Sequence, residues 1–200
     1  ALVEFFGHNV YSLRHLFKDE QRKILNLIIS EDVAKVGEAL RGILSDYSSV
    51  LSFLADLSMP APDAFRKVAE VVLNDDLQKA LAGPSLDLAF LDGRVADAEG
   101  WGISLEMQTL RHSARQKLDR LFDRLSLLPG DQHTLVELKG LLSFLRRRSW
   151  DVDLWGAQNR FAKMLNGGAG ISREEGELIG QVGDLLKIRT KGGRGAFSTL

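Results

Sequence analysis

Helical periodicity extends through almost the whole chain, and it constrains the fold more than any other feature of the sequence. Apolar residues recur at intervals of three and four, which places them on one face of an α-helix. No window of alternating apolar and polar residues is longer than residues 1–6, so a β-sheet has almost no material from which to form. We therefore predict an all-α fold, a helical bundle of about seven helices with antiparallel neighbours and almost no strand.

Four helices are predicted in the first half of the chain, from apolar stripes over residues 13–28, 33–54, 65–81 and 86–95. The second stripe follows the first at once. Pro60 and Pro62 end it, because proline lacks a backbone N–H and clashes with the preceding turn. The pair Gly83-Pro84 ends the third stripe, and the internal Gly93 weakens the fourth.

The clearest prediction is a helical hairpin. Its two stripes, Met107–Leu128 and Leu135–Leu145, are separated by Pro129-Gly130, and so short a connection makes the two helices antiparallel neighbours. Basic side chains on the first helix are interleaved with Asp119 and Asp123, which predicts a solvated face whose charges pair with one another, for example Arg115 with Asp119. The basic residues are Arg111, Arg115, Lys117, Arg120 and Arg124.

Two capping signals place the last helices. Asp153 is predicted to cap a helix over residues 154–165, because its carboxylate can accept a hydrogen bond from a free backbone N–H. Ser172 and Glu175 predict a capping box at the start of the final helix. The glycines of that helix share one face and favour close helix packing over a ligand groove; they are Gly176, Gly180 and Gly183.

The chain carries no strong internal linker, so we expect one helical domain over residues 1–186 and a flexible, basic, glycine-rich tail over residues 187–200. The proline-flanked break near residue 60 is the best alternative boundary. The longest apolar stretch, Ile24–Ile29, is far shorter than the roughly 20 residues that span a bilayer. Residues 1–10 lack the features of a secretory signal, so we expect a cytoplasmic protein.

Composition excludes several classes of function. Lys+Arg total 26 and Asp+Glu 27, for a formal net charge of −1, which argues against a dedicated nucleic-acid binder. The absence of cysteine excludes disulfides, thiolate metal sites and cysteine nucleophiles. The histidines lack the spacing that places two imidazoles on one helical face, so we expect no metal and no cofactor. No nucleophile elbow, phosphate loop or paired carboxylates predict a reaction, and we expect no catalytic residue in this chain.

The most informative stretch is residues 150–161. Its indoles could stack on the apolar faces of sugars while its carboxylate and amides exchange hydrogen bonds with hydroxyls. The candidate substrate-contact residues are Trp150, Asp153, Trp155, Gln158 and Asn159. The alternative is a buried helix contact, in which a neighbouring backbone group satisfies Gln158.

The dense basic cluster Arg146-Arg147-Arg148 is a candidate contact for an anion or for an acidic partner surface. The alternative is a charged helix end that lies beside its own carbonyl groups.

Two segments, Tyr11–Leu25 and Asp153–Phe161, resemble the uncharacterised C-terminal helical domain of glycoside hydrolase family 57, the alpha-amylase/alpha-mannosidase-like proteins. Enzymes of this family are retaining, with a Glu nucleophile and an Asp acid/base on an incomplete β/α barrel. This chain has no parallel strands to form that barrel, so no catalytic residue transfers. The helical appendages of other branches contribute aromatic contacts to substrate, which favours a role for Trp150 or Trp155.

The resemblance implies a noncatalytic domain that packs on an upstream glycosidase barrel in the same polypeptide and contributes to the binding of a polysaccharide or oligosaccharide. The alternative is a helical protein-protein interaction or oligomerisation module with no carbohydrate role. The glycine-lined final helix and the cluster Arg146–Arg148 favour this alternative.

Overall fold

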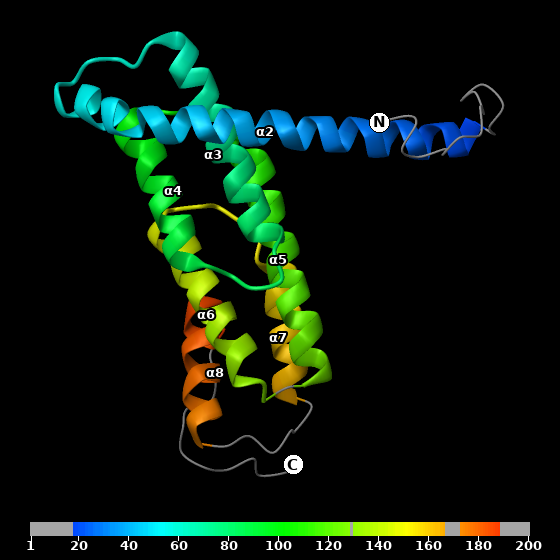
Figure 1. Cartoon of the computed structure of the whole chain (residues 1–200). Coiled ribbons are helices and arrows are strands. Elements are labelled where there is room, and N and C mark those ends of the chain that lie inside the picture. The colour runs from blue at the N-terminus through cyan, green and yellow to red at the C-terminus, as the bar shows by residue number, and fades with distance from the viewer. Residues whose placement is uncertain (1–17, 129, 167–172, 189–200) are drawn as a thin grey trace. The chain divides into compact units, whose positions relative to one another are not determined.

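A computed structural model describes residues 18–128, 130–166 and 173–188 of the chain. All regular secondary structure in these residues is helical, with no strand, which confirms the all-α prediction (Figure 1). None of the helices in these residues is both long and apolar enough to cross a membrane. The helices are α2 Lys18–Asp56, α3 Asp63–Ala82, α4 Leu88–Trp101, α5 Met107–Leu127, α6 Gln132–Arg147, α7 Trp155–Asn166 and α8 Arg173–Leu185.

The chain divides into two compact units, Ala1–Val72 and Leu73–Leu200. The division falls inside α3 and not at the prolines near residue 60. Those prolines do separate α2 from α3, but α3 then continues from the first unit into the second. The capping-box residue Ser172, the last residues of the predicted tail and the start of the segment Tyr11–Leu25 lie outside the described residues.

The first unit is dominated by α2, a single helix of 39 residues. The two stripes predicted over residues 13–28 and 33–54 belong, where the structure describes them, to this one helix. The residues between them include no proline or glycine, and Lys35 forms ion pairs with Glu31 at 3.2 Å and with Asp32 at 3.7 Å. Tyr47 contacts the ring of Phe65 in α3, with 4.5 Å between centroids.

The second unit is built around α6, which contacts α4, α5 and α8, while α5 also contacts α7. The predicted hairpin is confirmed as α5 and α6, and Figure 1 shows α6 returning beside α5. The fully buried side chains of the unit's core come from several helices and include Leu91, Leu110, Leu118, Leu121, Leu138, Phe144, Phe161 and Val182.

The C-terminal end of α6 determines where Trp150 lies. Ser149 adopts a left-handed backbone conformation, with φ of 53°. Its N–H donates to Arg146 O at 3.2 Å, and the N–H of Trp150 donates to Leu145 O at 2.9 Å. This pair of bonds is a Schellman motif, which turns the chain back across the helix end and brings the following residue onto the last turns. Trp150 accordingly packs edge-on against Phe144, with ring centroids 5.2 Å apart.

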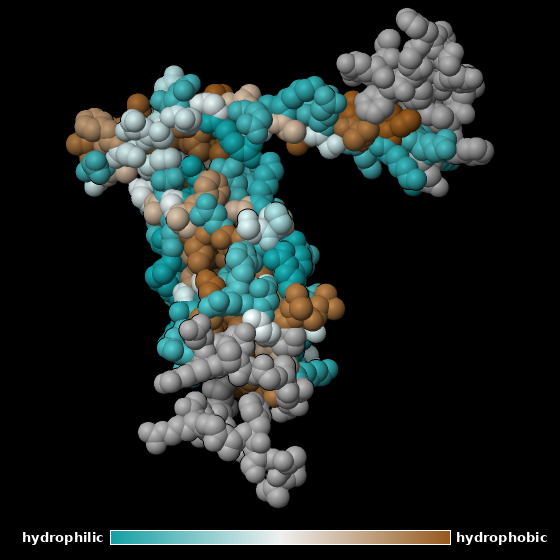
Figure 2. Space-filling view, turned by 60° about the horizontal axis from the view of Figure 1, so that its bottom comes forward, coloured by the Kyte–Doolittle hydropathy of each residue, from teal (hydrophilic) through white to brown (hydrophobic). Residues whose placement is uncertain are grey.

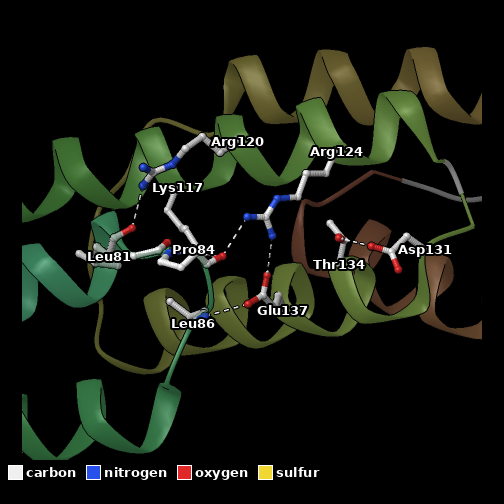
Figure 3. A network of polar contacts seen from close by, with 10 residues as sticks. Leu81, Pro84, Leu86, Lys117, Arg120, Arg124, Asp131, Thr134 and Glu137 are labelled. Atoms are coloured by element: carbon white, nitrogen blue, oxygen red, sulfur yellow. Dashed lines mark hydrogen bonds and ion pairs between the residues drawn. The ribbon is translucent and has the colours of Figure 1, made fainter.

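The basic face of α5 differs from its prediction. Lys117 is buried, and its ammonium group donates to Gly83 O at 3.0 Å and to Pro84 O at 3.2 Å. Arg120 donates to Leu81 O at 2.8 Å and to Ala82 O at 3.0 Å. The other four cations of this face are exposed, as predicted. The predicted exposure is wrong for Lys117, and the predicted pairing within α5 is wrong for Lys117 and Arg120, because these two cations satisfy carbonyl groups at the C-terminal end of α3, where the helix dipole is negative (Figure 3).

Glu137 completes this network from α6. Its side chain is nearly buried, accepts a hydrogen bond from the N–H of Leu86 at 2.7 Å and lies 3.5 Å from the guanidinium group of Arg124. Arg124 also donates to Pro84 O at 2.9 Å. Burial lowers the pKa of the Lys117 ammonium, and the cations of Arg124 and Arg120 act in the same direction, whereas Glu137 opposes them. The network fixes the chain between α3 and α4 against the hairpin.

Candidate functional site

The segment Asp153–Phe161 forms the start of α7. A carboxylate oxygen of Asp153 accepts a hydrogen bond from the N–H of Trp155 at 3.0 Å, which confirms that Asp153 satisfies a free backbone donor at this helix end. The helix begins at Trp155, one residue later than predicted.

One face of this segment attaches α7 to α5. Phe161 is fully buried and contacts Phe122 edge-to-face, with ring centroids 6.4 Å apart. Arg160 forms ion pairs with Asp123 and, at 3.7 Å, with Asp119. The two aspartates therefore pair with Arg160 of α7, and not with the cations of α5 as predicted.

Two of the candidate substrate-contact residues have structural roles. Trp150 is only 6% exposed, since it is held in the Schellman turn over Phe144. The amide nitrogen of Gln158 donates to the backbone oxygen of Leu186 at 2.9 Å. This is the bond to a backbone group that the alternative of a buried helix contact predicts for Gln158. These two side chains connect α7 and the end of α6 to the rest of the second unit.

The other candidates lie together on the surface. Trp155 is 70% exposed, and Asn159, also exposed, follows it by one helical turn and so shares its face. Asp153 precedes them and forms an ion pair with Arg115 of α5 at 3.2 Å. We call Asp153, Trp155, Asn159 and Arg115 the Trp155 surface.

Arg115 was missed as a candidate because the sequence pairs it most simply with Asp119, four residues away. Its actual partner is 38 positions along the chain and is brought near by the packing of α7 on α5. The only sequence signal for Arg115 is its place on a charged face of α5, which does not distinguish it from its neighbours. The Trp155 surface thus combines one exposed indole with a carboxylate, a guanidinium group and an amide.

The basic cluster at the end of α6 is engaged mostly within the unit. Arg148 lies 3.1 Å from a carboxylate oxygen of Asp92 and 2.8 Å from Glu99, and Arg147 also pairs with Asp92. Partial burial acts to raise the pKa of Asp92, but the hydrogen bonds and charges of the two arginines outweigh burial and hold the pKa below its usual value. Arg146 is exposed.

The face of α8 that carries glycines does not show the expected close approach at Gly176 or Gly180. A Cβ atom added at Gly176 or at Gly180 would meet no atom within 4 Å. A tight contact of another backbone with these glycines is therefore absent from the described part of the chain. Within the same residues, no group of three His, Asp or Glu side chains could hold a metal ion.

Comparison with protein-family models, with curated proteins and with solved structures finds no match for this chain.

Proposed function

We propose that the chain is a noncatalytic C-terminal helical domain of a cytoplasmic, family-57-type glycoside hydrolase. In this proposal the domain packs on a catalytic barrel in the same polypeptide, and the Trp155 surface contributes contacts to an α-linked glucan or a related polysaccharide. The observation that carries the proposal is the exposure of Trp155 within the segment that resembles the family.

The exposure of Trp155 is informative because the other aromatic side chain of the segment, Phe161, is fully buried. An exposed indole leaves a large apolar area in contact with water, and tryptophan at a surface commonly marks a binding site. Asn159 and the Asp153–Arg115 pair stand beside it. Amide, carboxylate and guanidinium groups supply both donors and acceptors, which a sugar that stacks on the indole would need for its hydroxyls.

Affinity electrophoresis in gels that contain soluble starch tests the carbohydrate part of this proposal. We expect the 200-residue chain to be retarded and Trp155→Ala to lose most of the retardation, with affinity about tenfold lower, because one stacking contact contributes about 1.5 kcal/mol. Phe53→Ala is the matched control, since Phe53 is a similarly exposed aromatic residue in the other unit. Equal retardation of the wild type and Trp155→Ala would remove the carbohydrate contact.

An antibody raised against this chain tests the attachment to a barrel. In a native lysate, we expect a band several times larger than the 22.2 kDa of the chain itself. A band at the mass of the chain alone would contradict a barrel in the same polypeptide. The carbohydrate part of the proposal would then depend on the starch experiment alone.

A second candidate function is a helical protein-protein interaction or oligomerisation module. The specific observation that favours it is a row of exposed apolar side chains along α2, which includes Ile29, Val33 and Val36. Arg147 and Arg148 add nothing to this candidate, since they pair with Asp92 within the chain.

A further inference from the structure

The apolar residues of α2 repeat with the spacing of a coiled coil. From Ile29 to Leu54 they alternate at intervals of four and three residues, which is the heptad pattern of a helix that winds around another helix. We define the α2 seam as Ile29, Val33, Val36, Leu40, Ile43, Tyr47, Val50 and Leu54. A helix that merely covers a globular core follows a wider stripe with a period of 3.6 residues.

Most of the α2 seam is exposed. Val33 is 63% exposed, Val36 59% and Val50 48%. Two further residues of α2, Leu44 and Leu51, are buried and lie beside the seam at other heptad positions. Within the seam, Tyr47 contacts Phe65 of α3 but is still 43% exposed. The helix thus carries buried residues beside an apolar face that is largely open to solvent. Figure 2 shows apolar side chains, in brown, on the surface of this long helix.

The length of the seam limits what can cover it. From Ile29 to Leu54 it extends over about 37 Å, at about 1.5 Å per residue. The next longest described helix, α5, has 21 residues, a length of about 32 Å, and its apolar stripe is already buried in the core of the second unit. Among the described helices, α2 itself, with 39 residues, is the one with both the length and the same open heptad pattern.

We propose that the α2 seam pairs with the α2 seam of a second copy of this chain. This inference names the partner for the second candidate function and does not depend on the carbohydrate proposal.

The charges beside the seam permit this pairing. The positions that flank a seam face the partner helix and decide which helices can approach. In α2 the charged flanking residues along the seam are Asp32 and Asp46. In a parallel, in-register pair Asp32 would lie opposite Gly37 of the second copy, and Asp46 opposite the flank that carries Leu51, a residue already buried within its own copy. Like charges meet at neither place. The other charged side chains of this stretch occupy the outer positions of the heptad.

Sedimentation velocity on the full 200-residue chain tests the pairing. We expect the mass of a dimer, twice the 22.2 kDa of one chain. Val36→Glu places a carboxylate in the seam and should weaken the dimer by about 100-fold or more, because the charge would be buried without a partner. Ser45→Glu, on the outer face of the same helix, is the matched control and should change the dissociation constant by less than about threefold.

Val36 is largely exposed in one copy, so Val36→Glu should keep the helical circular dichroism of the wild type. A wild-type chain that stays monomeric at high concentration would overturn the inference. A dimer that persists unchanged in Val36→Glu would overturn it equally, since the interface would then lie elsewhere.

Disulfide trapping identifies the surface that α2 contacts, and the chain is suited to it because it has no native cysteine. Ile43→Cys should form a covalent dimer under mild oxidation, whereas Ser45→Cys on the outer face should not. If the dimer dissociates in Val36→Glu but Ile43→Cys, Val36→Cys and Val50→Cys give no covalent product, α2 docks on a different surface of the second copy and the seam-to-seam pairing is refuted.

Discussion

Replacement by alanine should have a large effect on stability at one of the two tryptophans near the start of α7 and almost none at the other. Trp150 is 6% exposed and packs edge-on against Phe144. Its replacement by alanine removes a buried aromatic side chain and leaves a cavity, which should lower the free energy of unfolding by about 3–5 kcal/mol. Trp155 is 70% exposed, so Trp155→Ala should change the same quantity by less than about 0.5 kcal/mol.

The loss at Trp150 is large beside the total stability of a domain, about 5–15 kcal/mol. Trp150→Phe should cost less, about 1–2 kcal/mol, since a ring remains over Phe144 and only part of the volume is lost. The position of Trp150 after the left-handed Ser149 also matters, because the turn keeps the side chain over the helix end in both variants.

Urea unfolding followed by helical circular dichroism measures these differences, because that signal does not depend on the tryptophan that is removed. The expected order of midpoints is wild type and Trp155→Ala together, then Trp150→Phe, then Trp150→Ala, with unchanged slopes. If Trp150→Ala unfolds at the wild-type midpoint, or if Trp155→Ala is the more damaging change, the assignment of Trp150 to the core and of Trp155 to a surface site is refuted.

Three further predictions concern the second unit. Glu137→Leu should lower the free energy of unfolding by about 1–3 kcal/mol more than Glu137→Gln, because only glutamine keeps an acceptor for the Leu86 N–H; equal urea midpoints would contradict this. The pKa of Asp92 is lower in the folded chain than the 3.8 of the unfolded chain. The ionised Asp92 carboxylate therefore stabilises the fold fully above pH 3.8, and this stabilisation is lost as the pH falls through the lower pKa of the folded chain. Thermal unfolding at pH 6 and at pH 3 should therefore show a larger loss for the wild type than for Asp92→Asn, and parallel losses would exclude this role. Gly93→Ala should raise the stability of α4 by about 0.5–1 kcal/mol, since a Cβ there meets no atom within 4 Å; a lower melting temperature would show a contact that the structure lacks.

Much of the fold follows from local sequence. The hairpin of α5 and α6 was predictable because apolar spacing and the break at Pro129-Gly130 act within a few residues of each other. The cap at Asp153 was predictable for the same reason, since its hydrogen bond reaches only to Trp155. The prediction that the first two stripes form two separate helices was wrong. The apolar face changes between the stripes, but no residue there breaks the helix, so the helix continues.

The candidate site was predictable only in part. The sequence correctly predicted that a helix begins within the stretch from Trp150 to Asn159. It did not show which of the two indoles in this stretch is buried and which is exposed. The difference depends on Ser149, whose left-handed conformation turns Trp150 into the core. Arg115 was missed because its partner lies far along the chain.

The sequence by itself determined the helical class and where most of the helices begin and end, because periodicity, caps and breakers act over a single turn. Only the tertiary structure decided what the charged and aromatic side chains do. Lys117 bonds to carbonyls 34 and 33 positions earlier, and Arg148 to an aspartate 56 positions earlier. Such partners are chosen by which helices pack together, and the free energy of burying a charge or an indole depends on that packing and not on the neighbouring residues in the chain.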